Sequence, residues 1–465
     1  MPVRRTLGIL LAVVACLSSI VDAVDVNQAC IDLLLKELDP PVRYMGVIWS
    51  VFGDPEAEMD MSTRVKRHTH FPSARTEQAE VVLRAIEEAA MGLTKPTILY
   101  LITQDADTYD FYEREEKPEK RRQLAHVLNE CPSIFLLAWN PIIMDPVKGR
   151  LGHRTIPIPD FELFLEQDNA QDWRKRLPPL FLRQPSVAWR GSTTGIADYF
   201  PYTETDRFRI VETLLDIPGT DVKFSARVQK VTAEIVPDNM MGSSMTKEAL
   251  AMRRIMLDID GNCNAWSSMR WKLWSGSAVV KVVPAVRTFT QWYYPLLVDG
   301  VHLRTYNLSY RTEKNRSDKY SIAEAIIELD DDYDTISTIA EGGVRFAETY
   351  LTKAAAKKYI AELIPNIRHY ADIFETMDWR IRTPQSADTT LRSSKLFPPA
   401  PALPNNTVHA MSTPPHVIEL SAQDDGSWLP WYVWWAIVVV VVLLCVRSRR
   451  KVVGRRMPPG RPRSV

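Results

Sequence analysis

Hydrophobic positions along the chain alternate between helical and extended spacing. After Thr76, apolar side chains at Ala79, Val82, Leu83, Ile86 and Ala90 recur every three or four residues, which predicts a helix that ends near Gly92. Residues 97–103 (TILYLIT) follow, rich in β-branched and aromatic side chains and preceded by a proline. This run is too short for a helix, so we interpret it as a buried strand.

The same alternation continues as far as residue 363. Strands interleaved with helices favour an α/β fold in which parallel sheets are covered on both faces. The length of 465 residues fits two such sheets, with a junction near residues 160–179. Apolar strand-like runs occupy 134–139, 187–189, 222–224, 255–259 and 278–283, and helical stretches occupy 204–215, 265–274 and 335–363.

Both ends of the chain carry patterns typical of membrane targeting. Residues 1–23 combine two arginines, an apolar run and small residues near Ala23, as a signal peptide does. Residues 428–446 contain no charge, begin with clustered tryptophans and precede a basic tail at 447–465. We therefore expect one transmembrane helix with the tail in the cytosol and the body in the lumen.

Residues 384–427 differ in composition from the rest of the chain. Prolines, serines, threonines and asparagines dominate, and apolar periodicity is weak, so the segment cannot bury a core. We interpret it as a stalk. The expected domains are therefore an acceptor-side α/β domain at 24–170 and a donor-binding α/β domain at 171–383.

Charge and cysteine content limit the possible functions. The 57 basic and 57 acidic side chains balance, which gives no general attraction to nucleic acid. Cys30, Cys131 and Cys263 are the cysteines of the expected luminal body, so at most one intramolecular disulfide can form there. N-glycosylation triplets begin at Asn307, Asn315 and Asn405 and are consistent with that location.

The stretch AWRGSTTG at 188–195 comes directly after an apolar run and before an expected helix. Backbone N–H groups and a helix N-terminus at that position suit a phosphate. Gly191 and Gly195 permit close approach, Ser192 offers a hydroxyl, and Arg190 and Arg207 offer charge. An ordinary glycine-containing turn between strand and helix explains the local pattern equally well.

Two further clusters contain charged side chains that are candidates for ligand binding or catalysis. In residues 257–282, Arg270 lies between Met269 and Trp271 on a short helix, where a guanidinium needs an anionic partner, either a ligand or a structural carboxylate. Asp105 and Asp107 follow the TILYLIT strand. They fit a metal-binding pair, a general base with a structural neighbour, or a solvated turn.

Other catalytic signatures are missing from the sequence. His68 and His70 resemble a metal pair, but no third ligand lies near them in the sequence, so we expect histidines of a loop. The chain has no GxSxG, HExxH or CxxC pattern, so the sequence does not indicate a hydrolase triad, a zinc protease or a thiol redox site.

Taken together and in order, these clusters resemble the protein O-glucosyltransferase and capsule-associated protein family, glycosyltransferase family 90. The similarity runs from about residue 70 to 365. It rests on YLITQDAD, IPIPDF at 156–161, AWRGSTTG with Arg207, DIDGNCNAWSSMRWKLWSGSAVVKV, and QWYYPLLVDGVHL at 291–303.

The resemblance implies a GT-B-like pair of Rossmann-type domains with a central cleft. It also implies transfer of glucose or xylose from a UDP-sugar to a hydroxyl of a protein or glycan, with inversion and no metal or other cofactor. Asp105 would be the general base, with Asp107 as the alternative. The donor would contact Arg190, Gly191, Ser192, Arg207, Ala265, Trp266, Ser267, Ser268, Met269 and Arg270.

The chain departs from the soluble members of that family at its C-terminus. It ends in RPRSV after the expected membrane span, where those members end in a KDEL-like retrieval signal, so residence in either the endoplasmic reticulum or the Golgi membrane is compatible with it. Two alternatives stay open from the residues: a carbohydrate-binding or UDP-binding scaffold without turnover, and a metal-dependent transferase that uses Asp105 and Asp107.

Overall fold

The computed structural model describes most of the expected α/β body. The predicted signal peptide, transmembrane helix and basic tail, the pair Asp105 and Asp107, and most of the stalk lie outside the described residues. Within the described part of the chain, no helix combines the length and apolarity needed to span a bilayer. The described residues are 29–31, 46–51, 65–70, 80–102, 127–145, 148–164, 172, 174–195, 201–264, 267–284, 288–308, 318–384 and 396.

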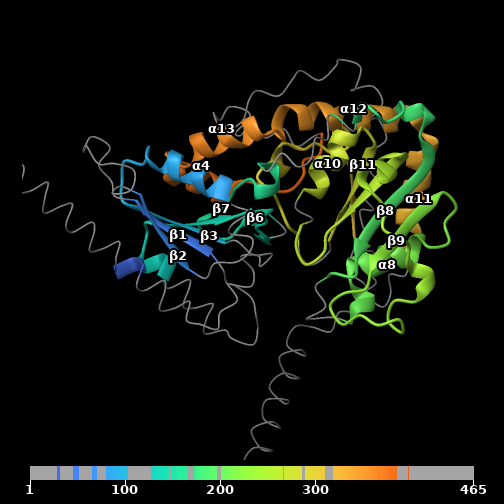
Figure 1. Ribbon diagram of the computed structural model, residues 1–465, viewed down its shortest axis with the longest axis horizontal. Helices are drawn as coiled ribbons and strands as arrows, with labels where there is room; N and C mark the ends of the chain where they lie inside the picture. The colour runs from blue at the N-terminus through green and yellow to red at the C-terminus, as the bar shows by residue number, and fades with distance from the viewer. Residues whose placement is uncertain are drawn as a thin grey trace, which may run out of the picture. The chain divides into compact units, whose positions relative to one another are not determined.

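The N-terminal sheet has five strands in the order β2-β1-β3-β4-β7, and it is mixed rather than parallel (Figure 1). β3, β4 and β7 run parallel, as expected, but β1 is antiparallel to both β2 and β3. The expectation of parallel strands alone is therefore wrong for this sheet. The strands are β1 (Gly46–Val51), β2 (Val65–His70), β3 (Thr97–Ile102), β4 (Ile134–Ala138) and β7 (Thr155–Pro157).

His68 and His70 lie in β2, which corrects their expected place in a loop. His68 is opposite Ile48 and His70 is opposite Gly46 in the ladder with β1. The sequence VKRHTH contains too few apolar residues to predict a strand. Pairing with the apolar GVIWSV of β1 supplies the stabilisation that this segment lacks by itself.

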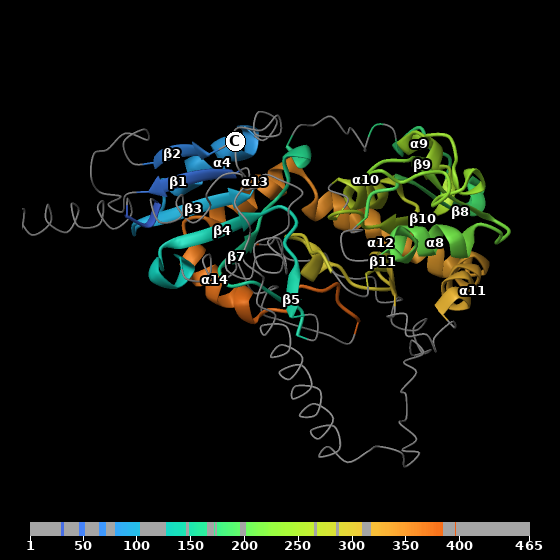
Figure 2. The ribbon, with the colours of Figure 1, turned by 90° about the horizontal axis from the view of Figure 1, so that it is seen from below.

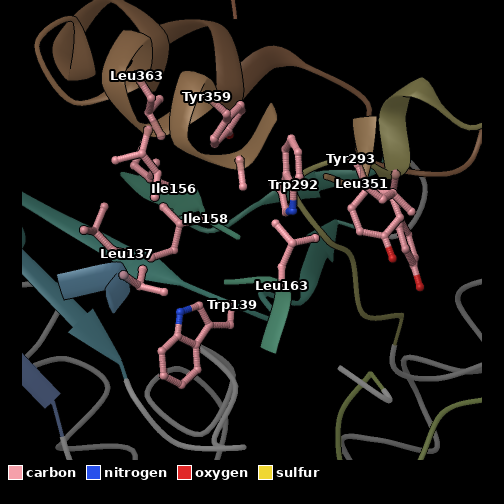
Figure 3. Close-up of a cluster of buried hydrophobic side chains, with 14 of the residues drawn as sticks. Leu137, Trp139, Ile156, Ile158, Leu163, Trp292, Tyr293, Leu351, Tyr359 and Leu363 are labelled. Carbon is pink, nitrogen blue, oxygen red and sulfur yellow. The ribbon is translucent and has the colours of Figure 1, made fainter. Parts of the chain in front are cut away.

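Both faces of the N-terminal sheet are covered. Side chains such as Leu137 and Ile156 on one face pack beneath α13 (Lys353–Leu363), where Trp292 and Tyr359 fill the layer (Figure 3). On the other face, Ile98 and Leu136 pack with residues around the disulfide between Cys30 and Cys131. This one disulfide is within the predicted limit of one, and Cys263 is a buried free thiol.

Five strands form the C-terminal sheet, and all of them are parallel, in the order β12-β11-β10-β8-β9. The chain adds β9 on one side of β8 and then returns to place β10 on the other side. This reversal of direction is the topological switch point of a doubly wound sheet. The strands are β8 (Gln184–Ser192), β9 (Thr220–Ala226), β10 (Arg253–Ile259), β11 (Ala278–Val283) and β12 (Arg304–Asn307).

Helices cover the C-terminal sheet on both sides (Figure 2). α8 (Asp206–Leu214) and α11 (Asp318–Asp331) contribute to one apolar layer. The other layer receives α9 (Lys247–Ala251) and α10 (Ser268–Ser275), whose left-handed C-cap Gly276 ends the helix where the sequence predicts.

The helical stretch expected at 335–363 consists of two helices. α12 (Tyr333–Tyr350) packs on α10 and β11, and α13 packs on α4 (Glu80–Ala90) of the N-terminal part. The Thr352 side chain accepts a hydrogen bond from Ala355 N and caps α13, so the chain changes direction there.

The predicted domain bounds 24–170 and 171–383 stay a prediction, although α13 and α14 (Ile367–Thr376) pack with elements of the first range. The remaining elements are short. They are the antiparallel pair β5 (Ile143–Asp145) and β6 (Arg150–Leu151), and the 3-10 turns Phe161–Leu163, Leu180–Leu182, Tyr202–Glu204, Asp238–Met240 and Tyr294–Leu296.

Candidate functional site

The carboxyl ends of β8 and β10 meet at the switch point of the C-terminal sheet. β8 extends to Ser192, three residues beyond the predicted strand, and β10 ends at Ile259. In doubly wound sheets, ligands bind at this crevice because the two neighbouring loops diverge there. The fold therefore brings AWRGSTTG and the DIDGN segment, about 70 residues apart in the chain, to one edge.

Arg207 joins these two segments from the first turn of α8. Its guanidinium donates to the carbonyl oxygens of Ser192 (2.9 Å), Ile259 (3.2 Å) and Asp260 (2.9 Å), and to the Thr194 hydroxyl. All these partners are neutral, so none of these four contacts cancels the buried charge. Burial lowers the pKa of Arg207, and nearby Asp260 opposes that shift.

Gly261 makes this position of Arg207 possible. A Cβ atom on Gly261 would lie 2.7 Å from Thr194 Oγ1 and 2.8 Å from Arg207 Nη2, too close for either to stay in place. The need for glycine at position 191 has a different explanation from the predicted close approach of a phosphate. Its Cβ would lie 2.4 Å from the Trp189 ring, so the absent side chain leaves room for that tryptophan.

The STTG loop is fixed by its own chain. Thr193 is fully buried, donates its hydroxyl to Val228 O at 3.0 Å and accepts from Val228 N. The Gly195 N–H, predicted to be open to an anion, donates to Asn262 Oδ1 at 2.9 Å. The loop is thus held in a defined shape beside the switch point.

Arg190 makes a different set of contacts. Its guanidinium donates to Asp221 Oδ1 at 2.6 Å, to Asp221 O at 2.7 Å and to Ser243 O at 3.0 Å, on the β9 side of the strand. Its hydrogen-bonding capacity is largely used in fixing β8 to β9. These contacts give Arg190 a structural role, and its predicted donor contact stays a prediction.

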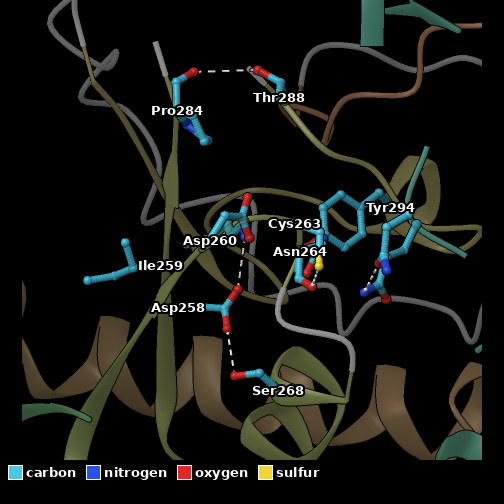
Figure 4. Close-up of polar contacts among 12 residues, drawn as sticks. Asp258, Ile259, Asp260, Cys263, Asn264, Ser268, Pro284, Thr288 and Tyr294 are labelled. Atoms are coloured by element: carbon cyan, nitrogen blue, oxygen red, sulfur yellow. Dashed lines mark hydrogen bonds and ion pairs between the residues drawn. The ribbon is translucent and has the colours of Figure 1, made fainter. Parts of the chain in front are cut away.

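A buried ionic cluster lies at the first turn of α10, where Asp258 contacts Ser268 (Figure 4). Asp258 Oδ1 accepts from Lys272 Nζ at 2.7 Å and from Ser268 Oγ at 3.0 Å, while its Oδ2 accepts from Lys281 Nζ at 2.9 Å. Lys281 also donates to Asp260 Oδ1. Each of the four ionic side chains is at most 6% exposed.

The cluster sets the protonation of its members. Burial would raise the pKa of Asp258, but its two lysine partners hold the pKa below its usual value. Burial raises the pKa of Asp260, helped by repulsion from Asp258 and opposed by Lys281. The pKa of Lys281 stays well above its usual value because two carboxylates outweigh burial, whereas burial lowers the pKa of Lys272.

Arg270 extends the cluster toward the N-terminal part of the chain. It is buried on α10, and its charge acts to lower the pKa of Asp160, the aspartate of IPIPDF. Burial nevertheless raises that pKa to about 6, with a further contribution from Glu162. Asp160 also caps the turn Phe161–Leu163 by accepting from Leu163 N at 3.2 Å. Asp160 is therefore one carboxyl group close enough to Arg270 to interact with it electrostatically.

Positive charge is in excess around α10. Three buried cations, Arg207, Lys272 and Lys281, interact with the carboxylates of Asp258 and Asp260, and a fourth, Arg270, interacts with Asp160. Within the described ranges, no group of three or more His, Cys, Asp or Glu side chains is arranged to hold a metal. The local field therefore favours an anionic ligand.

Two cavities adjoin the cluster and differ in size. The smaller, about 70 Å³, is lined by Arg190, Arg207, Ser268 and Lys272 among others. The larger, about 520 Å³, is lined by Asp260, Lys281 and Tyr294 among others. Only the larger cavity is within the range of about 300–1,000 Å³ that small-molecule sites have.

The predicted donor residues therefore divide into three groups. Arg207 and Ser268 line one cavity at the switch point, Ser192 contributes its carbonyl oxygen to Arg207, and Arg270 lies on α10 near Tyr293. Arg190 and Gly191 have structural partners, Met269 is fully buried in the core, and Ser267 immediately precedes α10. Ala265, Trp266, Asp105 and Asp107 lie outside the described residues.

Several residues of the cluster were not predicted from the sequence. Asp258 in the strand RRIMLDI and Lys281 in the strand AVVKVV are charged residues within apolar runs. A charge within an apolar strand needs a buried partner of opposite sign. This pattern in the two strands would have indicated that Asp258 and Lys281 form an ion pair. Asp160 was noticed only as part of IPIPDF, because its neighbour Arg270 is 110 residues away in sequence.

Comparison with known proteins yields only distant structural likenesses. No protein-family model matches the sequence, and no curated protein matches it. The GtfA/B complex aligns at a TM-score of 0.31 and 10% identity, over 53% of this chain and 56% of that chain. This chain therefore spans little more than half of that protein.

Two further solved structures have similar scores. HepE of Anabaena in complex with UDP-glucose aligns at a TM-score of 0.32 and 11% identity, over 62% of this chain and 81% of that chain. The pneumococcal O-GlcNAc transferase GtfA, with UDP and GlcNAc, aligns at 0.28 and 9% identity, over 54% and 55%. With scores this low, none of these proteins determines a substrate for this chain.

Proposed function

We propose that this protein is a UDP-sugar-dependent glycosyltransferase. It would move glucose or xylose to a hydroxyl of a protein or glycan acceptor with inversion at the anomeric carbon. One C-terminal helix would hold its body in the lumen of the endoplasmic reticulum or Golgi. The acceptor class, the inversion and the location rest on the resemblance to glycosyltransferase family 90.

One observation supports this function above the others. Arg207, Lys272 and Lys281 concentrate buried positive charge at the carboxyl edge of a parallel sheet, and Arg270 adds a buried cation in the first turn of α10. A diphosphate leaving group gains negative charge in the transition state of glycosyl transfer. Fixed cations and a helix N-terminus stabilise that charge because they need no reorganisation when it develops.

The role that we propose for each residue follows from its contacts and position. Arg270 and the first turn of α10 would face the diphosphate, while Arg207 would hold the Ser192–Thr194 and Ile259–Asp260 backbones in register and contribute its charge. Asp105 would remove the proton of the acceptor hydroxyl as its oxygen attacks. β3, from which the chain leads to Asp105, ends three residues earlier at Ile102.

The first test is UDP binding by the full-length chain in detergent, measured by isothermal titration. We expect Arg270→Ala to weaken binding by about tenfold or more, as loss of a charge-assisted contact does. Arg345→Ala, which removes an exposed arginine of α12, is the matched control and should bind as the wild type does. Absence of UDP binding by the wild type would refute the proposed function.

The second test is turnover. Release of UDP from UDP-glucose, UDP-xylose and UDP-galactose would identify the donor. Asp105→Asn should retain UDP binding and lose about 10²-fold or more in transfer. UDP binding without transfer or hydrolysis for any donor would instead favour the non-catalytic scaffold, and loss of activity in EDTA would favour the metal-dependent transferase.

A further inference from the structure

β12 is an edge strand of the C-terminal sheet. Within the described residues it pairs with β11 on one side, and no strand pairs with its other side. The Leu308 N–H donates to Val283 O of β11 at 3.0 Å. Because neighbouring residues of a strand alternate in direction, the N–H groups of Thr305 and Asn307 face the open side instead. Outward N–H groups of this kind can pair with a strand of a second molecule.

The opposite edge of the same sheet is closed by the chain itself. There, the segment that follows the turn Asp238–Met240 covers β9. Met241 forms a bridge with Phe224, and the Gly242 N–H donates to Phe224 O at 2.7 Å. These contacts occupy edge groups with which a second molecule could otherwise pair. The two edge strands of the sheet are therefore protected in different ways.

Two charged side chains protect the first half of the β12 edge. Asp299 Oδ1 accepts a hydrogen bond from Thr305 N at 2.7 Å, and Asp299 Oδ2 lies 3.7 Å from Arg304 Nη1. The Arg304 side chain is 46% exposed, and charge on an edge strand discourages pairing. The Asn307 N–H lies about 6.6 Å farther along the strand than the Thr305 N–H, beyond the reach of the same carboxylate oxygen. This protection therefore ends before Asn307.

An N-glycosylation triplet begins at this point of the edge. Asn307 is the last residue of β12 and is exposed, and Leu308 and Ser309 complete the triplet. The triplets at Asn315 and Asn405 begin outside the described residues. An N-linked glycan is bulky and strongly hydrated. On Asn307 it would keep a second strand away from the half of the edge that Asp299 does not reach.

We propose that Asn307 carries an N-linked glycan, and that this glycan prevents two copies of the protein from pairing edge to edge through β12. In this modification, Asn307 Nδ2 bonds to the anomeric carbon of an oligosaccharide carried on a lipid diphosphate. The bond between that carbon and the diphosphate oxygen breaks, the lipid diphosphate leaves, and Nδ2 releases one proton. The inference rests on the luminal location in the proposed function, because such triplets are modified in the secretory pathway.

Occupancy of Asn307 is measured in the full-length chain produced in cultured eukaryotic cells. Peptide mass spectrometry before and after enzymatic removal of N-glycans reports it, together with occupancy of Asn315 and Asn405. We expect a glycan on Asn307 in the wild type and in Ser309→Thr, which keeps the triplet, and complete loss of it in Ser309→Ala. Both variants keep the asparagine, so the difference between them isolates the glycan.

Self-association of the purified full-length chain in detergent is then measured by analytical ultracentrifugation. Ser309→Ala should lower the Kd of self-association by about tenfold or more relative to Ser309→Thr, because a few backbone hydrogen bonds between two edges become possible. Asn307→Gln and Asn307→Pro both lack the glycan, but only glutamine keeps the outward N–H. We therefore expect Asn307→Gln to associate as Ser309→Ala does, and Asn307→Pro to associate less.

Chemical denaturation checks that Asn307→Pro is folded, and the pair of Ser309 variants decides the question if it is not. Three outcomes would overturn the inference. They are no glycan on Asn307 while another triplet is occupied, no glycan on any triplet, which would also contradict the luminal location, and loss of the glycan without a change in self-association. UDP titration is independent of these measurements, so absence of UDP binding would refute the proposed transferase activity and leave the assignment of Asn307 intact.

Discussion

Asp258 on β10 and Lys281 on β11 form a fully buried ion pair, with Oδ2 and Nζ 2.9 Å apart, at the carboxyl edge of the C-terminal sheet. The strands are in register with Asp258 opposite Lys281, so the pair also fixes their alignment. A second lysine, Lys272, binds the other carboxylate oxygen. The floor of both cavities depends on these contacts.

Lys281→Met should destabilise the protein by about 3–5 kcal/mol, because it leaves buried carboxylates without their shared cation. Chemical denaturation monitored by tryptophan fluorescence measures this change. Lys223→Met, at a half-buried site of β9, is the matched control and should shift the free energy of unfolding by no more than about 0.5 kcal/mol. Equal effects of the two changes would contradict the structural role of the buried pair.

Much of this fold was predictable because its signals are local. The apolar run at 278–283 became β11 with the same bounds, and the Ser275-Gly276 stop ends α10 as expected. β2 was not predictable, since VKRHTH depends on pairing with β1. The meeting of Arg207 with the DIDGN segment followed from strand order, which depends on long-range packing rather than on local spacing.

The candidate site was only partly predictable for the same reason. Sequence patterns selected Arg207, Ser268 and Arg270 because each belongs to a motif with turn or helix signals. They also selected Arg190, which in the fold binds Asp221. A motif indicates which residue types are gathered in a segment, but the direction of each side chain depends on the neighbouring strand.

Asp160 should make stability depend on pH. Its native pKa of about 6 exceeds its ordinary value of 3.8, so the native state holds the proton more tightly than the unfolded state. This group therefore stabilises the fold most below pH 4, and its contribution falls as pH rises from about 4 to 6, by about 3 kcal/mol in all. Asp160→Asn should remove this dependence.

Chemical denaturation of the wild type and of Asp160→Asn at pH 4, 5, 6 and 7 measures the contribution of Asp160 to the pH dependence of stability. Asparagine can still accept from Leu163 N, so the cap of the turn is kept and serves as the internal control. We expect the difference in free energy of unfolding between the variant and the wild type to grow with pH in the variant's favour. A constant difference across this range would refute the assignment.

The disulfide between Cys30 and Cys131 closes a loop across 101 positions of sequence. Changing both cysteines to alanine should lower the free energy of unfolding by about 2–5 kcal/mol, because the unfolded chain regains the freedom that the bond removes. Cys263→Ser is the control, since this buried thiol is not in a disulfide and donates to Asn264 O. An unchanged denaturation midpoint in the double variant would contradict the stabilising role.

Gly261 links the stability of the switch point to binding of the donor. Gly261→Ala would place a methyl group 2.7 Å from Thr194 Oγ1 and 2.8 Å from Arg207 Nη2, so the Thr194 hydroxyl and the guanidinium must shift, which strains the bonds of Arg207 to its three carbonyl partners. Such overpacking costs about 1–3 kcal/mol in stability. UDP affinity should fall as well, because the Ser192–Thr194 segment and the cation beside it lose their positions.

Gly195→Ala is the matched control for this change. Its added methyl group would lie 3.3 Å from the Thr205 methyl carbon, a contact that a small shift relieves, and it touches no atom of Arg207. We expect near wild-type UDP affinity in this variant and a clear loss in Gly261→Ala, both measured by isothermal titration. If Gly261→Ala lost stability but bound UDP normally, Arg207 would be a structural residue alone, and the donor phosphates would depend on Arg270 and α10.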